Sequence, residues 1–238
     1  MFHNAHAYVT KRLYKSEDDL LLIGSILPDI AITKIIGWDD GLHGSRNMNK
    51  FAKYIKNKPD YINLYRGVYV HNIVDNLAHK RFSGGKGYAY QNNREIVRLI
   101  ISVYGLSLKD AQIKAHNYLE SAVDILLLQK YPEIQTKIRI AIKRTDVVKL
   151  STLLSIYFNQ DRNEFANALS QYFNLIIKYD LSKKQNWILF WDNLEELMSL
   201  KRIDNDKKKE ILNKSISISK NSYENFLNNP ELTSLSYE

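Results

Sequence analysis

No glycine follows Gly105 in this chain of 238 residues, and only four prolines are spread along it. Glycine and proline are the residues that most often interrupt a helix, so long segments run without a natural stop. These segments are rich in Leu, Ile, Lys, Glu, Asn and Ala, and their apolar residues recur at spacings of three and four, as in Leu150, Leu153, Leu154 and Tyr157. The sequence therefore predicts an all-α protein.

Capping residues and breakers set the predicted ends of the helices. Ser16 precedes three acids and is expected to cap a helix that ends near Leu27, because Pro28 disfavours helical backbone in the residue before it. Gly105 is expected to end one helix and Ser107 to cap the next. Helices are predicted at 4–14, 16–26, 47–57, 61–81, 91–104, 107–131, 133–144, 146–158, 161–180, 183–200 and 206–228.

The remaining segments are predicted to be loops. Residues 29–46 contain three glycines and little periodicity, residues 83–87 are rich in glycine, and residues 228–238 form an irregular tail. The composition changes near Pro132 without a linker. We therefore expect a helical core at 1–132 and additional C-terminal helices at 133–238 packed on it.

Composition limits the class of protein. Apolar residues make up 45% of the chain, which is enough for a sizeable core, and no run of about 18 apolar residues predicts a membrane span. The chain has no cysteine, which excludes disulfides and thiolate metal sites. The first residues show no apolar signal region, so a cytoplasmic location is expected, with a mature secreted chain as the alternative.

All six histidines lie between residues 3 and 116, and several stand in regular patterns with carboxylates. His71, Asp75 and His79 form an H-x3-D-x3-H run, and His116 and Glu120 form an H-x3-E pair. Residues four apart on a helix lie one above the other, so each helix can aim two ligands at one ion. We interpret this pattern as a polynuclear metal site.

The geometry of the H-x3-D-x3-H run predicts how its residues are shared. His71 and Asp75 suit one ion, whereas His79 is rotated by about 80° from His71 and better suits a neighbouring ion, with Asp75 between them as a bridge. On its own, a histidine with a carboxylate four residues away is more often a surface ion pair than a metal site, and His79 beside Lys80 and Arg81 is also typical of a solvated helix end. Asp124, one turn beyond Glu120, is either a further ligand or part of an exposed face.

In this order and spacing, the motifs resemble those of the zinc-dependent phospholipase C family, whose fold is shared with the zinc-dependent single-strand nucleases. The resemblance covers Asn4 to Asp124. It rests on the Asn4-Ala5-His6 start, on the G-x3-P-D turn from Gly24 to Asp29, on His43 after that turn, and on the H-x3-D and H-x3-E pairs. It implies a multi-helix phospholipase C/nuclease-like domain.

The resemblance also implies three zinc sites. Asp29, His43, His71 and Asp75 would hold the first ion, and His79, His116 and Glu120 the second. His6 and Asp75 would hold the third ion, which the terminal amine completes in the family. Iron, manganese and nickel accept the same ligands as zinc.

Two features depart from the family pattern. His79 follows Asp75 after a shorter gap than the phospholipase members have. Met1 lies only five residues before His6, and Phe2 disfavours its removal, so the terminal amine is not expected to reach the third ion. Either His3 replaces the amine or the protein binds two ions rather than three.

The net charge favours an anionic substrate. Residues 1–132 carry 18 Lys and Arg against 12 Asp and Glu, which is +6 of the total of +8. A phosphoester, in a phospholipid or a nucleotide, suits such a site, although lysines spread along the chain also give a generally basic surface. We expect a hydrolase in which metal-activated water attacks a phosphodiester and Asp29, by family analogy, accepts its proton. Lys86 and Arg46 are candidate phosphate contacts.

Three alternatives remain open from the sequence. A single-strand nuclease would need aromatic platforms, for which tyrosines such as Tyr88 and Tyr90 are available. A phospholipase would need an apolar rim such as Ile35 to Trp38. A non-catalytic helical binding protein would use its histidines structurally. A di-iron bundle would need more glutamates at Glu-x-x-His spacing than this chain has. The oligomeric state is not specified by the sequence.

Overall fold

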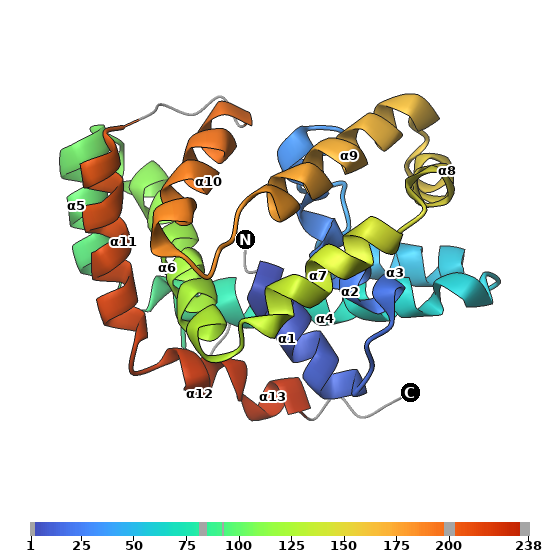
Figure 1. Cartoon of the computed structure of the whole chain (residues 1–238), viewed down its shortest axis with the longest axis horizontal. Helices are drawn as coiled ribbons and strands as arrows, with labels where there is room; N and C mark the ends of the chain where they lie inside the picture. The colour runs from blue at the N-terminus through green and yellow to red at the C-terminus, as the bar shows by residue number, and fades with distance from the viewer. Residues whose placement is uncertain (1–2, 81–84, 92, 198–202, 234–238) are drawn as a thin grey trace. The chain divides into compact units, whose positions relative to one another are not determined.

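The computed structural model describes residues 3–80, 85–91, 93–197 and 203–233, and these residues form helices joined by short connections, with no strand among them (Figure 1). The predicted all-α fold is confirmed. The chain divides into two compact units, and each unit combines segments from both halves of the sequence. The expected division at Pro132 stays a prediction.

The first unit comprises residues 6–72 and 133–180. Helices α2 and α7 pack on each other in it, α8 packs on α9, and α9 packs on the 3-10 helix η1. Its elements are α1 (His3–Tyr14), α2 (Asp19–Ile26), η1 (Leu27–Thr33), α3 (Gly44–Ile55), η2 (Pro59–Tyr61), most of α4 (Ile62–His79), α7 (Glu133–Arg144), α8 (Val147–Phe158) and α9 (Arg162–Lys178).

The second unit comprises residues 1–5, 73–132 and 181–238, within which α6 packs against α5 and α11. Buried tryptophans of α10 contribute to its core. Its elements include the end of α4, η3 (Tyr88–Tyr90), α5 (Arg94–Tyr104), α6 (Leu108–Lys130), α10 (Lys184–Leu197), α11 (Asn205–Ser219), α12 (Tyr223–Leu227) and α13 (Pro230–Thr233). Helices α1 and α4 pass from one unit into the other.

Glycine allows a close approach of α2 and α4 within the first unit. A Cβ atom added to Gly67 would lie 2.2 Å from the Leu21 carbonyl oxygen, and one added to Gly24 would lie 2.1 Å from the Leu64 carbonyl oxygen. Both distances are far below van der Waals contact, so any side chain would push the helices apart. The contact sets the position of the turn after α2 against α4.

Several predicted helix ends are confirmed. Helix α7 spans the predicted residues 133–144, Ser107 caps α6 through the Asp110 N–H, and Gly105 ends α5 with a φ of +65°. Glycine adopts this left-handed conformation without the steric cost that a Cβ atom brings.

Other predictions were wrong. Asp18, rather than Ser16, caps α2, because its carboxylate accepts the Leu21 N–H. The predicted loop at 29–46 is helical at both ends, where η1 and α3 lie. The predicted helix at 206–228 breaks after Ser219, and the predicted irregular tail contains the short helix α13. Residues 83–84 and 234–238 of the two predicted irregular segments lie outside the described residues.

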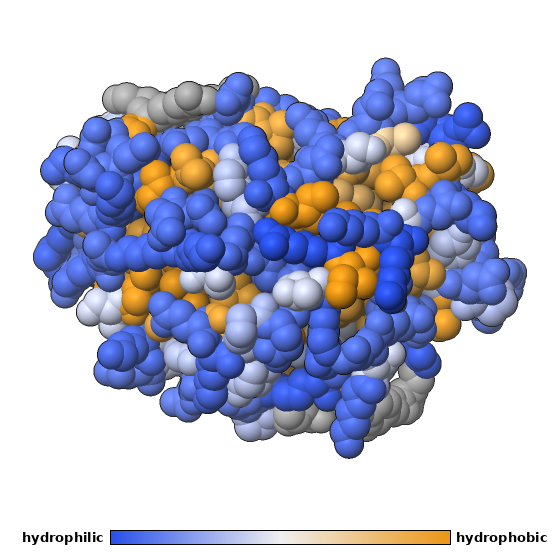
Figure 2. Space-filling view, viewed as in Figure 1, coloured by the Kyte–Doolittle hydropathy of each residue, from blue (hydrophilic) through white to orange (hydrophobic). Residues whose placement is uncertain are grey.

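Hydrophilic residues cover most of the face shown in Figure 2, and the most hydrophilic form a band over α7. Basic residues of α7 meet acidic partners: Lys137 pairs with Glu17, and Arg144 Nη1 lies 3.9 Å from the Asp19 carboxylate. None of the helices among the described residues is both long and apolar enough to cross a membrane.

Candidate metal centre

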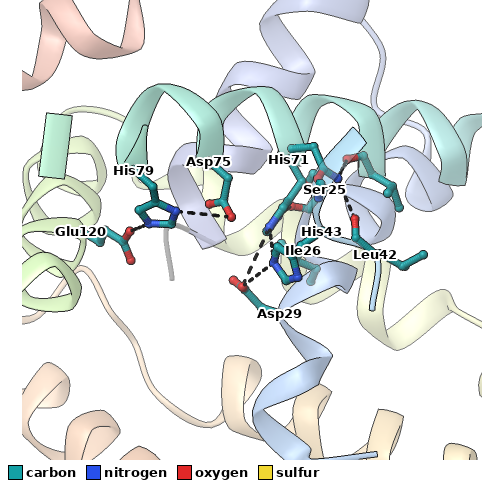
Figure 3. A network of polar contacts seen from close by, with 12 residues as sticks. Ser25, Ile26, Asp29, Leu42, His43, His71, Asp75, His79 and Glu120 are labelled. Atoms are coloured by element: carbon teal, nitrogen blue, oxygen red, sulfur yellow. Dashed lines mark hydrogen bonds and ion pairs between the residues drawn. The ribbon is translucent and has the colours of Figure 1, made fainter. Parts of the chain in front are cut away.

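His71 is fully buried on α4 and lies among the first group of potential metal ligands. Its Nδ1 is 2.9 Å from the carbonyl oxygen of Ser25 near the end of α2 (Figure 3). A carbonyl can only accept a hydrogen bond, so Nδ1 carries the proton and the lone pair of the neutral ring lies on Nε2. Metal-binding histidines are oriented in this way by a second hydrogen bond.

The Nε2 atom of His71 faces two further potential ligands. It lies 3.3 Å from His43 Nε2 and 3.9 Å from Asp29 Oδ1, and that oxygen is 3.7 Å from His43 Nε2 (Figure 3). Two nitrogens that each bind zinc at about 2.0–2.1 Å in a tetrahedral site are about 3.3–3.4 Å apart. The separation of the two imidazole nitrogens therefore suits a shared zinc ion.

His6 completes this group from α1. Its ring stacks on that of His71 with centroids 3.9 Å apart, and one ligand atom each from His6, Asp29 and His71 lie within 4.8 Å of one another. All three residues are buried. We call His6, Asp29, His43 and His71 the His71 cluster. Imidazole nitrogen and carboxylate oxygen in a confined buried site form a donor set that zinc accepts.

A second group of potential ligands lies between the end of α4 and α6. His79 Nε2 is 2.6 Å from Glu120 Oε1, and His79 Nδ1 is 3.8 Å from Asp75 Oδ2 (Figure 3). One ligand atom each from His79, His116 and Glu120 lie within 4.8 Å of one another. We call Asp75, His79, His116 and Glu120 the His116 cluster. Its donor set also fits zinc.

Protonation in the His116 cluster reflects burial and charge. Burial lowers the pKa of His116 to about 4, so its ring is neutral at pH 7 and can bind a metal. Burial would raise the pKa of Glu120, but nearby positive groups, including the imidazoles of His116 and His79, hold it at about 2. Burial opposes protonation of His79, yet its hydrogen bond with Glu120 and the charges of Glu120 and Asp75 raise its pKa.

Helix α4 supplies ligands to both clusters, since His71 belongs to one and Asp75 and His79 to the other. His71, Asp75 and His79 follow one another at intervals of four residues on α4. Each of them lies beside further histidines and carboxylates of its own unit. A bridging role for Asp75 stays a prediction.

The profile of the zinc-dependent phospholipase C family matches residues 1–234. The chain belongs to this family. The resemblance predicted from the sequence is confirmed, and it extends over the C-terminal half, where the sequence showed no recognisable motif. Members of the family are zinc-dependent hydrolases of the phospholipase C type. No match was found among curated proteins or among solved structures.

Four further candidates from the sequence lie outside the two clusters. Asp124 is fully buried, and its carboxylate accepts the N–H groups of Asn4 and Ala5 at the start of α1. His3 is buried with its ring edge-on to Phe190 at 6.2 Å. Lys86 and Arg46 are exposed.

Two orienting contacts were not predicted from the sequence of this phospholipase C family member. The Ser25 carbonyl that orients His71 is a backbone group, and no residue type signals it. The Tyr90 hydroxyl lies 3.3 Å from His116 Nδ1, and its oxygen can accept a hydrogen bond from the Nδ1–H group, which leaves Nε2 for a metal. Tyr90 was predicted only as one of several possible stacking platforms. Its position in the Tyr88–Tyr90 3-10 helix, directly after the glycine-rich loop, was the available signal.

Proposed function

We propose that this protein is a zinc-dependent phosphodiesterase that hydrolyses phospholipids, with zinc held in both the His71 and the His116 clusters. The observation that carries the proposal is the arrangement around His71. Its Nδ1–H is bound to the Ser25 carbonyl, and its Nε2 faces His43 Nε2 at 3.3 Å and Asp29 Oδ1 at 3.9 Å. Membership of the zinc-dependent phospholipase C family supports the same reaction class.

The clusters would bind at least two ions, one each, and the residues of 1–132 would supply all the ligands. Zinc, when bound, is a Lewis acid that activates water and offsets the charge that develops on phosphate oxygens. We assign to Asp29 a double role as ligand and base. Its Oδ1 faces both imidazoles, and its Oδ2 would accept the proton of the attacking water.

The His43 side of the His71 cluster would admit the substrate. The side chain of His43 is 17% exposed, whereas those of Asp29 and His71 are 5% and 0% exposed. Arg46 follows His43 by three residues and is exposed, so we propose that it contacts the phosphate. Lys86 is a second candidate for such a contact.

A phospholipid substrate is supported by the loop that precedes His43. Trp38 in this loop is 43% exposed, and its ring centroid lies 5.2 Å from that of His43. Tryptophan prefers the boundary between water and lipid, where its apolar ring and polar N–H are both satisfied. Ile36 of the predicted apolar rim is buried instead, so Trp38 is the part of the rim that is available to a lipid.

Zinc content tests the proposal directly. Protein purified without chelators should contain at least two zinc ions per chain, and His71→Ala and His116→Ala should each lose about one. Asn76→Ala and Gln112→Ala are matched controls, because these exposed residues lie on the same helices, α4 and α6. Full metal content in the His71/His116 double variant would show that the clusters do not bind zinc.

Substrate class is tested with phosphatidylcholine, single-stranded DNA and bis-p-nitrophenyl phosphate. We expect hydrolysis of the lipid and of the small phosphodiester, both abolished by His71→Ala. Hydrolysis of DNA in preference to lipid would identify a nuclease with the same centre. If the protein bound zinc but hydrolysed none of these three substrates, it would be a non-catalytic binding protein.

A further inference from the structure

Helix α3 carries a row of basic residues on its exposed face. Arg46, Lys50 and Lys53 are exposed on successive turns, and Lys56, also exposed, follows as the C-terminal cap. The opposite face buries Phe51 and Ile55. We call Arg46, Lys50, Lys53 and Lys56 the α3 basic face. The helix contains no acidic residue, so no neighbour along it offsets these charges.

The α3 basic face differs from the other basic helix of its unit. Lys137 and Arg144 of α7 lie beside acidic residues of the same unit. Within the described part of the chain, no residue of the α3 basic face forms an ion pair. Like charges three or four apart on a helix repel each other, so this arrangement reduces stability rather than adding to it. An external anionic surface would offset the repulsion.

The α3 basic face adjoins the candidate entrance to the His71 cluster. His43, whose side chain is 17% exposed, is the N-cap of α3. The exposed ring of Trp38 lies against His43. A surface that bound both the lysines and Trp38 would therefore lie next to His43.

We propose that the α3 basic face binds the anionic surface of a lipid bilayer and so brings phospholipid headgroups to the His43 side of the centre. The proposal rests on the proposed function for its choice of a lipid partner. Basic residues attract anionic headgroups through Coulomb forces that fall off within the Debye length, whereas Trp38 enters the interface through its ring. Binding therefore depends on lipid charge and on salt, and it needs no zinc.

Vesicle sedimentation tests this inference with the full chain. The test variant is Lys50→Gln, Lys53→Gln and Lys56→Gln, which leaves Arg46 in place. The control variant is Lys109→Gln, Lys143→Gln and Lys220→Gln. Lys109 and Lys143 lie on α6 and α7, Lys220 is the C-terminal cap of α11, and these exposed residues form no ion pair in the described part of the chain. Each variant loses three charges, from +8 to +5, so net charge is matched.

Wild type and control should bind vesicles of phosphatidylcholine mixed with phosphatidylserine and dissociate at high salt. The test variant should bind these vesicles roughly a hundredfold more weakly, since each basic residue near such a surface contributes about fivefold. Equal weakening in both variants would mean that net charge alone acts, and would overturn the proposal. Loss of single-stranded DNA binding with vesicle binding intact would assign the face to nucleic acid instead.

Fluorescence gives a second measurement that does not depend on turnover. Trp187 and Trp191 are buried, at 0% and 1% exposure, so Trp38 is the tryptophan that a bilayer can reach. Anionic vesicles should shift the emission of wild type to the blue but not that of Trp38→Phe. Absence of a shift in wild type would exclude an interface contact at Trp38. Neither binding assay measures hydrolysis. If the protein bound vesicles but contained no zinc, the proposed function would be refuted and the membrane-binding inference would stand.

Discussion

Asn72 holds the backbone on both sides of His43. Its Nδ2 donates to the Leu42 carbonyl at 2.8 Å, and its Oδ1 accepts the Gly44 N–H at 2.6 Å. The residues before and after His43 are thereby tied to α4, one position beyond His71. The hydrogen bonds of a single side chain thus couple the His43 loop to the helix that carries the other central imidazole.

Replacing Asn72 should therefore weaken zinc binding without removing a ligand. Asn72→Ala is expected to lower zinc affinity of the His71 cluster by about 10- to 100-fold, the usual effect of losing a group that orients a ligand. Competition with a chromophoric chelator measures this affinity. Asn72→Asp keeps the acceptor but loses the donor, so it should fall between wild type and Asn72→Ala. An unchanged affinity in Asn72→Ala would show that the His43 loop is held by other contacts.

Asp124 is expected to stabilise α1 rather than bind zinc. It accepts three hydrogen bonds, from the Asn4 and Ala5 N–H groups and from the Asn4 side chain. The first N–H groups of a helix have no hydrogen-bond partner within the helix. A carboxylate beside them also interacts favourably with the positive end of the helix dipole. Asp124→Ala should lower the free energy of unfolding by about 3 kcal/mol, measured in urea.

The zinc content of Asp124→Ala separates the two roles. If Asp124 only positions α1, folded Asp124→Ala protein should bind the same number of zinc ions as wild type. Loss of one ion at unchanged stability would make it a ligand. Gln129→Ala, at an exposed position on the same helix, is the control and should change stability by less than about 0.5 kcal/mol.

Gly67 should tolerate no side chain. A Cβ atom there would lie 2.2 Å from the Leu21 carbonyl oxygen and 2.6 Å from the Ser25 nitrogen, and both are backbone atoms that cannot rotate away. Gly67→Ala should cost about 3 kcal/mol of unfolding free energy or more. It should also displace the Ser25 carbonyl that orients His71, and so lower zinc affinity. Gly37→Ala is the control, because a Cβ atom there would meet only the Asp40 side chain at an ordinary 3.5 Å.

Local patterns predicted the all-α fold and the spacing of histidines and carboxylates along α4. The spacing of four between His71, Asp75 and His79 is a property of one helix, so it could be predicted without knowing what packs on it. Gly105 and Ser107 marked helix ends for similarly local reasons. The tertiary contacts of each residue involve residues distant in the sequence. The periodicity of a single helix does not indicate those contacts.

The features that were not predicted depend on contacts between residues distant in the sequence. The partners of Asp124 lie about 120 residues away, so its position on α6 next to a run of apolar residues carried no signal of its role. The Ser25 carbonyl is a backbone group that any residue type offers. Asn72 acts through its side-chain amide, but its partners Leu42 and Gly44 lie about 30 residues away in the sequence. The breaks in the predicted helix at 206–228 fall in polar sequence without a glycine, where propensity alone favours continuation.

A buried ionic network in the second unit gives the last prediction. Glu195 and Lys208 are both fully buried, with Lys208 Nζ 2.7 Å from Glu195 Oε2. The other oxygen of Glu195 accepts from Lys114 Nζ at 3.2 Å and from the Tyr104 hydroxyl at 3.1 Å. Burial lowers the pKa of Lys114 and raises that of Tyr104, and the charge of Glu195 raises the pKa of both groups. Removing it would leave Lys114 without its ion-pair partner and Lys208 with only the partly exposed Asp192.

Glu195→Leu should therefore lower the free energy of unfolding by about 3–5 kcal/mol, because uncompensated charge remains in the core. The Glu195→Leu/Lys208→Met variant removes both members of the closest pair and should recover part of that loss. Urea denaturation of the wild type, both single variants and the double variant measures the coupling between the two residues. If Glu195→Leu is as stable as wild type, or the two losses simply add, the network does not hold α10 and α11 together. Zinc content should stay unchanged throughout, since Glu195 and Lys208 belong to neither cluster.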